Sequence, residues 1–276
     1  MSTRRQFLKG VLALSALPLL AGTDRDDTVL RFLHVTDSHM DLHHPKTVEA
    51  MRKLVERVNS DYRDIDFVLF GGDNFNNNAP GTDDAKRFKE IIEAMHCPGY
   101  LVRGNKESSP KGDAQVDLDG FKRLFFTPQM HIHGKDWMIE RKGVVILGLD
   151  SCVEGGNNGR FTPETLAFAE EALKMGRPTV ILDHHSYVNY WGGTDPKDIH
   201  KYVLNNAEET IERLFGYENL VLALSGHRHI DNVTMIGHVP AVTTRAFISA
   251  FGEGKYPMRY VEISRTGSVS QKLVST

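Results

Sequence analysis

Five short polar motifs in this chain could bind metal ions and support hydrolysis. Each follows a run of apolar residues and combines carboxylate, amide or imidazole side chains. In chain order they are Asp37-Ser38-His39, Gly72-Asp73-Asn74, Gly104-Asn105-Lys106-Glu107, Asp183-His184-His185 and Gly226-His227-Arg228-His229. Carboxylate and amide oxygens together with imidazole nitrogens suit zinc, manganese or iron. These motifs offer more ligands than one tetrahedral ion can take, so we expect two ions that share a bridging ligand.

The spacing within the motifs favours this two-ion interpretation. Alternate residues of an extended segment face the same side, so Asp37 and His39 can share one ion, as can His227 and His229. Two ions about 4 Å apart can hold both the attacking and the departing oxygen of a phosphoryl displacement, and bound water reaches a pKa of about 7. The motifs therefore predict hydrolysis of a phosphoester.

The apolar runs around the motifs predict an α/β fold. We expect strands at 29–36, 66–70, 99–102, 178–182 and 220–224, a hairpin of 137–140 with 144–149, and antiparallel strands at 232–236, 241–244, 259–263 and 269–273. Helices are expected at 47–59, 83–95, 162–175 (with Thr162 as N-cap) and 205–215. The β-α-β-α-β alternation at the start predicts parallel strands, whose carboxyl ends form sites. The fold class is thus two packed mixed β-sheets flanked by helices, an α/β/β/α sandwich, in one domain of residues 27–276.

Composition limits the classes of partner. The chain has 276 residues, with 33 Lys and Arg against 36 Asp and Glu, which gives a formal net charge of −3. This balance argues against binding extended nucleic acid through bulk charge, whereas a small phosphoester can still bind because metal ions supply local positive charge. Cys97 and Cys152 have no CxxC spacing, so a zinc-finger type of site is excluded. We expect them to be two free, buried thiols.

The first residues resemble a twin-arginine export signal. Arg4 and Arg5 precede Phe7-Leu8-Lys9 and a short apolar run from Val11 to Ala21. That run is about half of the ~20 residues that a membrane-spanning helix needs, so no stable membrane span is expected. The resemblance implies that residues 1–26 are a signal peptide read by the twin-arginine export machinery. The mature protein would then be periplasmic or otherwise extracytoplasmic, and its metal could be inserted before export.

The ordered set of motifs resembles the calcineurin-like metallophosphoesterase family over about residues 29 to 245. The resemblance implies a first ion bound by Asp37, His39 and His229. It implies a second ion bound by Asn105, His184 and His227, with Asp73 as the bridge between the two. Strand phase and the usual family position favour His184 over His185 as the ligand. His185 is then expected to support a neighbouring ligand from behind.

Lys106 departs from the family pattern, which usually has Gly-Asn-His at this point. Lysine can stabilise charge in the transition state, but its ordinary pKa of about 10.4 makes it a poor proton donor near neutral pH. One interpretation gives Lys106 an electrostatic role and lets His43 or His44 supply the proton. Another restricts the enzyme to good leaving groups. His43 and His44 could equally belong to a solvated loop.

Two functional classes remain open at this stage. The first is an exported phosphoesterase that hydrolyses a small phosphodiester or phosphomonoester at a centre of two Mn, Fe or Zn ions. The alternative is a metal-binding or phosphate-binding protein of the same fold with weakened turnover, and only Lys106 favours it. The aromatic residues of segment 186–193 could stack on a base or sugar or fill a core under a long loop.

Overall fold

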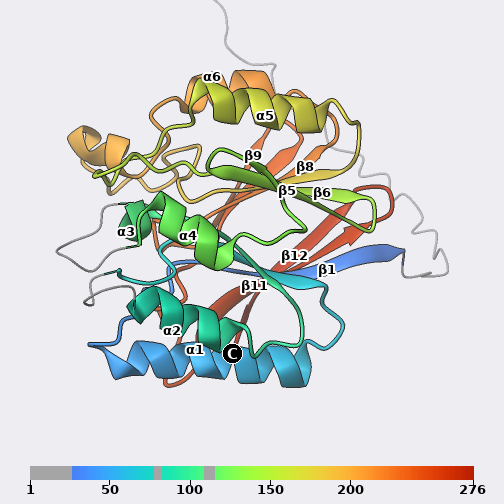
Figure 1. The fold of residues 1–276 in the computed structure, drawn as a ribbon. Coiled ribbons are helices and arrows are strands. Elements are labelled where there is room, and N and C mark those ends of the chain that lie inside the picture. Colours follow the sequence, from blue (N-terminus) through green and yellow to red (C-terminus); the bar gives the residue numbers. More distant parts are fainter. Residues whose placement is uncertain (1–26, 78–82, 109–115) are drawn as a thin grey trace, which may run out of the picture.

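Two β-sheets pack face to face between two layers of helices (Figure 1). The computed structural model describes residues 27–77, 83–108 and 116–276. The predicted α/β/β/α sandwich is confirmed by this arrangement. The predicted signal peptide of residues 1–26 lies outside the described residues.

The first sheet joins early and late parts of the chain, in the order β12-β11-β1-β2-β3. Its strands are β1 (Thr28–Val35), β2 (Phe67–Gly71), β3 (Gly99–Val102), β11 (Pro257–Ser264) and β12 (Val269–Ser275). As the alternating pattern predicts, β1, β2 and β3 are parallel, whereas β11 runs antiparallel to both β1 and β12. The crossover helices α1 (Pro45–Asp61) and α2 (Asp83–Ile92) cover its outer face (Figure 1).

The second sheet has the order β4-β5-β6-β7-β8-β10-β9. Its strands are β4 (His131–His133), β5 (Asp136–Arg141), β6 (Val144–Gly148), β7 (Thr179–Leu182), β8 (Leu220–Ser225), β9 (Asn232–Ile236) and β10 (Val239–Thr243). β5 and β6 form the expected hairpin. The expected antiparallel pairing of β9 with β10 is present, but β10 also pairs parallel with β8, which was not expected. After β8 the chain first runs to the sheet edge as β9 and then returns beside β8.

The helices of the second half cover the outer face of the second sheet. They are α5 (Pro163–Leu173) and α6 (Ala207–Leu214), seen at the top of Figure 1. The predicted N-cap of α5 is present: Thr162 accepts a hydrogen bond from the backbone N–H of Thr165, and Pro163 occupies the first turn. Three short helices lie in the connections: α3 (Asn105–Ser108), α4 (Leu118–Phe125) and a 3₁₀ helix, Pro196–Lys201.

Apolar side chains fill the three interfaces of this sandwich. Met51 and Phe88 pack between the first sheet and its helices, Phe32 and Ile146 lie between the two sheets, and Leu166 lies under the helices of the second sheet. All five are fully buried. Packing of this kind fixes the positions of the strand ends, and with them the positions of the polar motifs.

Two further sequence predictions concern single residues and membrane helices. Cys97 and Cys152 are free, and Cys152 is buried, but Cys97 is only half-buried because it precedes β3 at the rim of a cavity.

Among the described helices, none has both the length and the apolar character needed to cross a membrane.

Candidate metal centre

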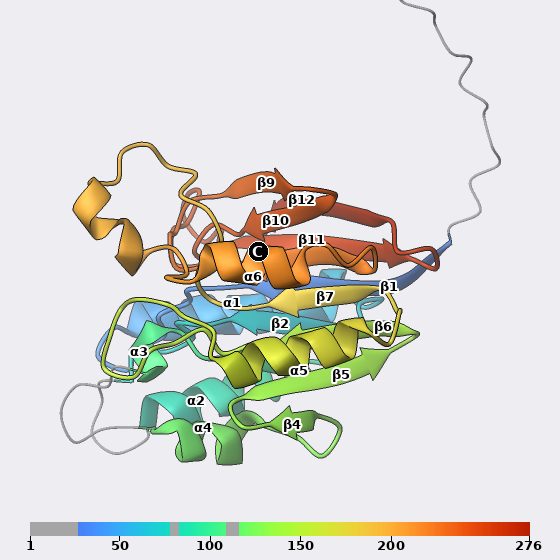
Figure 2. The ribbon, with the colours of Figure 1, turned by 90° about the horizontal axis from the view of Figure 1, so that it is seen from above.

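The five polar motifs meet at one edge of the sandwich. They follow the carboxyl ends of β1, β2, β3, β7 and β8, and Figure 2 shows α3, which begins at Asn105, at that edge. Two groups of candidate ligands form there, each with its ligand atoms within 4.8 Å of one another. The groups are Asp37, His39 and His229, and Asp73, His184 and His227. The structure therefore brings together the residues that the sequence predicts as ligands.

Asp73 lies between the two groups. Its Oδ2 atom is 3.7 Å from Nε2 of His39, in the first group. Its Oδ1 atom is 3.5 Å from Nε2 of His184, in the second group, and also accepts a hydrogen bond of 2.8 Å from the backbone N–H of Lys106. A carboxylate that presents one oxygen to each group is placed to bridge two ions.

Five of the candidate ligands adopt a left-handed backbone conformation. Their φ angles are 54° for Asp37, 43° for His39, 50° for Asp73, 66° for His227 and 60° for His229. Such conformations in non-glycine residues cost of order 1–3 kcal/mol each and persist only where the surroundings enforce them. Their concentration at one edge of the sheets marks a functional site.

The first group fits a cation through the chemistry of Asp37. Its Oδ2 atom accepts hydrogen bonds from Thr36 Oγ1 at 2.7 Å and from the backbone N–H of His227 at 2.8 Å. Its buried Oδ1 atom lies 3.2 Å from His229 Nε2 but has no hydrogen-bond partner among the residues that the structure describes. One oxygen is thus held by the protein and the other is left for an ion.

The orientation of the His39 ring also fits a bound cation. Its Nδ1 atom lies 3.1 Å from Oδ1 of Asn76, which can only accept, so Nδ1 carries the proton and Nε2 presents a lone pair. Nε2 of His39 lies 3.1 Å from Nε2 of His229. Two nitrogens that both bind the same zinc ion at about 2.0–2.1 Å lie roughly 3.0–3.4 Å apart, so the observed separation fits one ion shared by His39 and His229.

The second group shows the same pattern of oriented rings. Nδ1 of His184 donates to the carbonyl of Gly71 at 2.8 Å, so Nε2 presents its lone pair towards Oδ1 of Asn105 at 3.3 Å. Nε2 of His227 donates to the carbonyl of Lys201 at 2.6 Å, which leaves Nδ1 unprotonated. Acceptor atoms that face one another in this way suit a cation between them.

His185 cannot take the place of His184 in this arrangement. Its Nε2 atom donates to the carbonyl of Asn157 at 3.1 Å, and its Nδ1 atom accepts from the hydroxyl of Ser151 at 2.8 Å. Both ring nitrogens are therefore occupied. The ring lies 4.5 Å from that of His227 between centroids, so His185 packs behind a candidate ligand.

The clustered carboxylates favour positive charge at the site. Burial lowers the pKa of His184, but the charges of Asp73 and Asp37 outweigh it and raise the pKa to about 10. Burial raises the pKa of Asp37, yet the His229 ring, 3.2 Å away, and the charge of His184 bring it down to about 2. The pKa of His227 falls to about 4, through burial and then repulsion by His184. The site is thus built to hold a cation, either a proton or a metal ion.

Two supporting residues were not assigned by sequence reasoning. The buried carboxylate of Glu107 accepts hydrogen bonds from four backbone N–H groups, those of Asp73, Asn74, Phe75 and Gly104. Asn157 accepts a hydrogen bond of 3.3 Å from Asn105 Nδ2 and so turns Asn105 Oδ1 towards His184. Glu107 stands in a recognised motif, but its role emerges only from the fold. For Asn157, the only signal in the sequence was the glycine-rich loop around it.

A cavity of about 180 Å³ opens over both groups. Side chains that are not candidate ligands also line it, namely Lys106, Asn157, Lys201 and Tyr202. The structure does not place His43 and His44 in this cavity. Their side chains are 59% and 70% exposed, and each lies beside the carboxylate of Asp41 at the start of α1.

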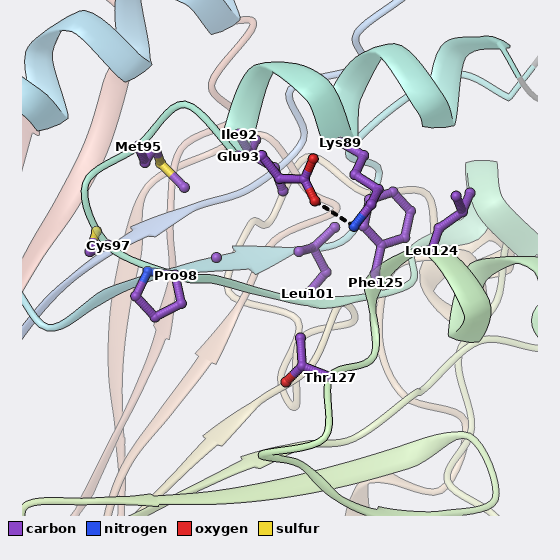
Figure 3. A pocket seen from close by; sticks show the side chains of 11 residues that line it. Lys89, Ile92, Glu93, Met95, Cys97, Pro98, Leu101, Leu124, Phe125 and Thr127 are labelled. Carbon is purple, nitrogen blue, oxygen red and sulfur yellow. Dashed lines mark ion pairs between the residues drawn. The ribbon is translucent and has the colours of Figure 1, made fainter.

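Another cavity, of about 300 Å³, lies at the opposite end of β3 (Figure 3). It is lined mainly by apolar side chains of α2, β3 and α4, such as Leu101 and Phe125, and the ion pair of Lys89 with Glu93 stands at its side. Its lining contains neither of the two candidate metal groups. The cavity over the metal groups is therefore the candidate active site.

Comparison with known proteins places the chain in a family. Residues 30–231 match the model of the calcineurin-like phosphoesterase family, so the chain belongs to this family. Its activity is that of a hydrolase acting on phosphoester bonds. The resemblance seen in the sequence motifs is thereby confirmed at the level of the family.

Two relatives match over most of their length. A probable glycerophosphodiester phosphodiesterase of Arcobacter nitrofigilis is 26% identical over 203 residues, which are 71% of this chain and 68% of the relative. A probable cyclic nucleotide phosphodiesterase of Psychrobacter arcticus is 22% identical over 219 residues, which are 74% and 75% of the two chains.

Solved structures share the fold at low sequence identity. A dimetal phosphatase from Danio rerio has a TM-score of 0.64 at 11% identity, over 90% of this chain and 99% of that structure. A purple acid phosphatase from yellow lupin has a TM-score of 0.64 at 13% identity, over 88% of this chain and 51% of that structure.

Proposed function

We propose that this protein is an exported phosphodiesterase that hydrolyses small phosphodiesters with the help of two metal ions. The observation that carries the proposal is the position of Asp73, whose two carboxylate oxygens face the two groups of candidate ligands. The preference for a diester is supported by the two relatives above, both described as probable phosphodiesterases. The cavity over the metal groups has a volume of about 180 Å³. That volume is below the range typical of sites for drug-sized molecules, which favours a small ester.

We divide the candidate ligands between the two ions as the family resemblance implies. Asp37, His39 and His229 would hold one ion, and Asn105, His184 and His227 the other, with Asp73 shared between them. Two bound ions would supply a nucleophile near neutral pH and neutralise the negative charge of the phosphoryl oxygens.

Lys106 adds positive charge from the protein itself. Its side chain lines the cavity while its backbone N–H is fixed by Asp73. We assign it to the stabilisation of charge on the phosphoryl group, where an ammonium group acts without transferring a proton. Hydrolysis would then be fastest for esters whose leaving alcohol needs little protonation.

Hydrolysis of bis-aryl and mono-aryl phosphate tests this function. Purified protein is assayed after chelation and after addition of Mn, Fe or Zn, alongside Asp73→Asn and the matched surface variant Asp64→Asn, whose side chain is 61% exposed. Activity restored by metal, retained in Asp64→Asn and lost in Asp73→Asn supports the proposal. If wild-type protein binds two ions per chain without hydrolysing either ester, the weakened binding protein becomes the better description.

Export is proposed from the first residues of the sequence alone. Arg4 and Arg5 with the apolar run that follows them support it. Fractionation of cells that produce the wild-type chain or the Arg4→Lys/Arg5→Lys variant tests the proposal. Wild type should reach the extracytoplasmic fraction in a shortened form and the variant should remain inside; equal export of both would contradict a twin-arginine route.

A further inference from the structure

Arg228 stands between two candidate ligands in the sequence and packs against three aromatic rings. Its guanidinium carbon lies 5.6 Å from the ring centroid of Tyr190, 5.5 Å from that of Trp191 and 4.7 Å from that of Tyr202. The residue is only 6% exposed. Three aromatic side chains therefore surround one buried cation.

The polar atoms of Arg228 form few hydrogen bonds, so contacts with the aromatic rings are what mainly stabilise its position. Nη2 makes one long hydrogen bond of 3.4 Å to the carbonyl of Trp191. Nε and Nη1 are buried and have no hydrogen-bond partner within the described ranges. A buried guanidinium that leaves donors unpaired is unfavourable unless other contacts offset the loss, and the cation–π contacts are the ones present.

These contacts join two segments at the candidate active site. We call residues 190–202 the aromatic wall and residues 227–230 the ligand loop. The hydroxyl of Tyr190 donates to the carbonyl of Ile230 at 2.9 Å, and Nε2 of His227 donates to the carbonyl of Lys201 at 2.6 Å. The wall is thus attached to the ligand loop near both of its ends, with Arg228 between these two attachments.

The wall also forms part of the cavity, since Lys201 and Tyr202 line it. Tyr187, just before the wall, instead packs in the core against Phe215, with ring centroids 4.9 Å apart. The aromatic run therefore serves two purposes: Tyr187 anchors the segment in the core, and the wall faces the site. Trp191, at 49% exposure, marks the outer side of the wall.

We propose that Arg228 is a positioning residue that holds the aromatic wall against the ligand loop, so that Tyr202 and Lys201 form the surface that receives the alcohol group of the phosphoester. This inference rests on the proposed function for its substrate. It assigns substrate recognition to a segment that contributes no candidate metal ligand. Arg228 acts on the substrate only through the wall.

Fluorescence gives a readout that needs no turnover. The chain has two tryptophans, and Trp137 is fully buried, so changes in accessibility report on Trp191. Arg228→Met should raise acrylamide quenching and shift the emission to the red, whereas Arg228→Lys, which keeps a cation over the rings, should stay near wild type. Lys272→Met is the matched control, because it removes a cation 5.3 Å from the ring of Tyr260 on the first sheet.

Kinetics with a bis-aryl phosphate tests the role in recognition. Arg228→Met should raise KM about tenfold, keep kcat within about threefold and retain two ions per chain, and Arg228→Lys should recover most of the loss. Unchanged quenching and unchanged KM would overturn the proposal. Loss of metal from Arg228→Met would also overturn it, because Arg228 would then act on the ligands rather than the wall. If wild type hydrolyses no ester, the proposed function fails, and quenching still decides whether Arg228 holds the wall.

Discussion

Nε2 of His39 lies 3.1 Å from Nε2 of His229, while Nδ1 of His39 donates to Asn76. The lone pair of His39 thus points at a second ring nitrogen, so either a proton or a metal ion must lie between them. The same competition exists at His184, whose Nε2 atom lies 3.3 Å from the acceptor oxygen of Asn105. Protons and metal ions therefore compete for the same positions.

Metal binding should release protons. Because the pKa of His184 is raised to about 10, the metal-free protein holds a proton at neutral pH that an ion must displace. For this one proton, apparent affinity should fall by up to about tenfold for each unit that the pH drops from 9 to 7. Calorimetric titration with Zn in two buffers of different ionisation enthalpy measures the release, and identical heats in both buffers would contradict it.

Glu107→Gln should weaken both the fold and the site. A glutamine has one acceptor oxygen where the buried carboxylate receives four backbone N–H groups, and its amide would face donors. We expect a loss of about 2–4 kcal/mol in the free energy of unfolding and about 10–100-fold in metal affinity. Urea unfolding of the metal-free protein and metal titration measure the two effects.

Glu93→Gln is the matched control for that variant. The carboxylate of Glu93 is 60% exposed and pairs with Lys89, four residues earlier. Because an exposed ion pair contributes little, the change should lower the free energy of unfolding by no more than about 0.5 kcal/mol. Equal stability losses in the two variants would show that Glu107 has no special structural role.

Lys106→Ala should lower kcat by about 10–100-fold for aryl esters without removing metal, because the variant loses a cation that lines the cavity. Lys106→Arg should retain part of the activity. The test compares kcat and metal content in all three proteins. A kcat equal to that of wild type in Lys106→Ala would exclude the electrostatic role.

The double variant His43→Ala/His44→Ala should hydrolyse aryl esters within about twofold of wild type, because both side chains are exposed and lie beside Asp41 instead of in the cavity. A comparison of aryl and alkyl esters makes this measurement sharper. A selective loss on alkyl esters would instead identify one of these histidines as the proton donor.

The two thiols should stay reduced and react at very different rates. Burial, and next the charge of Asp66, raises the pKa of Cys97 to about 11, so its half-buried thiol should react slowly with an aryl disulfide near neutral pH. Cys152, buried within the fold, should react only after unfolding. Two thiols per chain titrated in urea, with Tm unaffected by reducing agent, would confirm that both stay reduced; no titratable thiol would indicate a disulfide between them.

The parallel core and the positions of the polar motifs could be predicted from the sequence because local patterns determine both. Asp37 and Asp73 follow apolar strands, and such strand ends converge in any parallel sheet. The sheet to which each of the last strands belongs could not be predicted, because β11 and β12 have the same kind of local sequence pattern as β9 and β10. Only long-range pairing assigns them to the other sheet.

Within the site, sequence reasoning identified ligand types but not what orients them. Asn157 and Glu107 act through contacts with residues 52 and 34 positions away, at Asn105 and Asp73. No periodicity in the sequence reports such contacts. The position of His43 and His44 outside the cavity has a local cause instead, because both rings lie beside the buried carboxylate of Asp41 at the start of α1.

The pairing of β1 with β11 sets an order of events during synthesis. β1 occupies the middle of the first sheet, and Arg31 lies opposite Glu262, a residue that leaves the ribosome 231 positions later. Until β11 arrives, one edge of β1 has no strand to pair with, and the apolar face that β11 completes stays open to solvent. Contacts between such distant residues slow folding. The ligand motifs are therefore synthesised before the last strands of the protein. The first sheet can close only after those strands have been made.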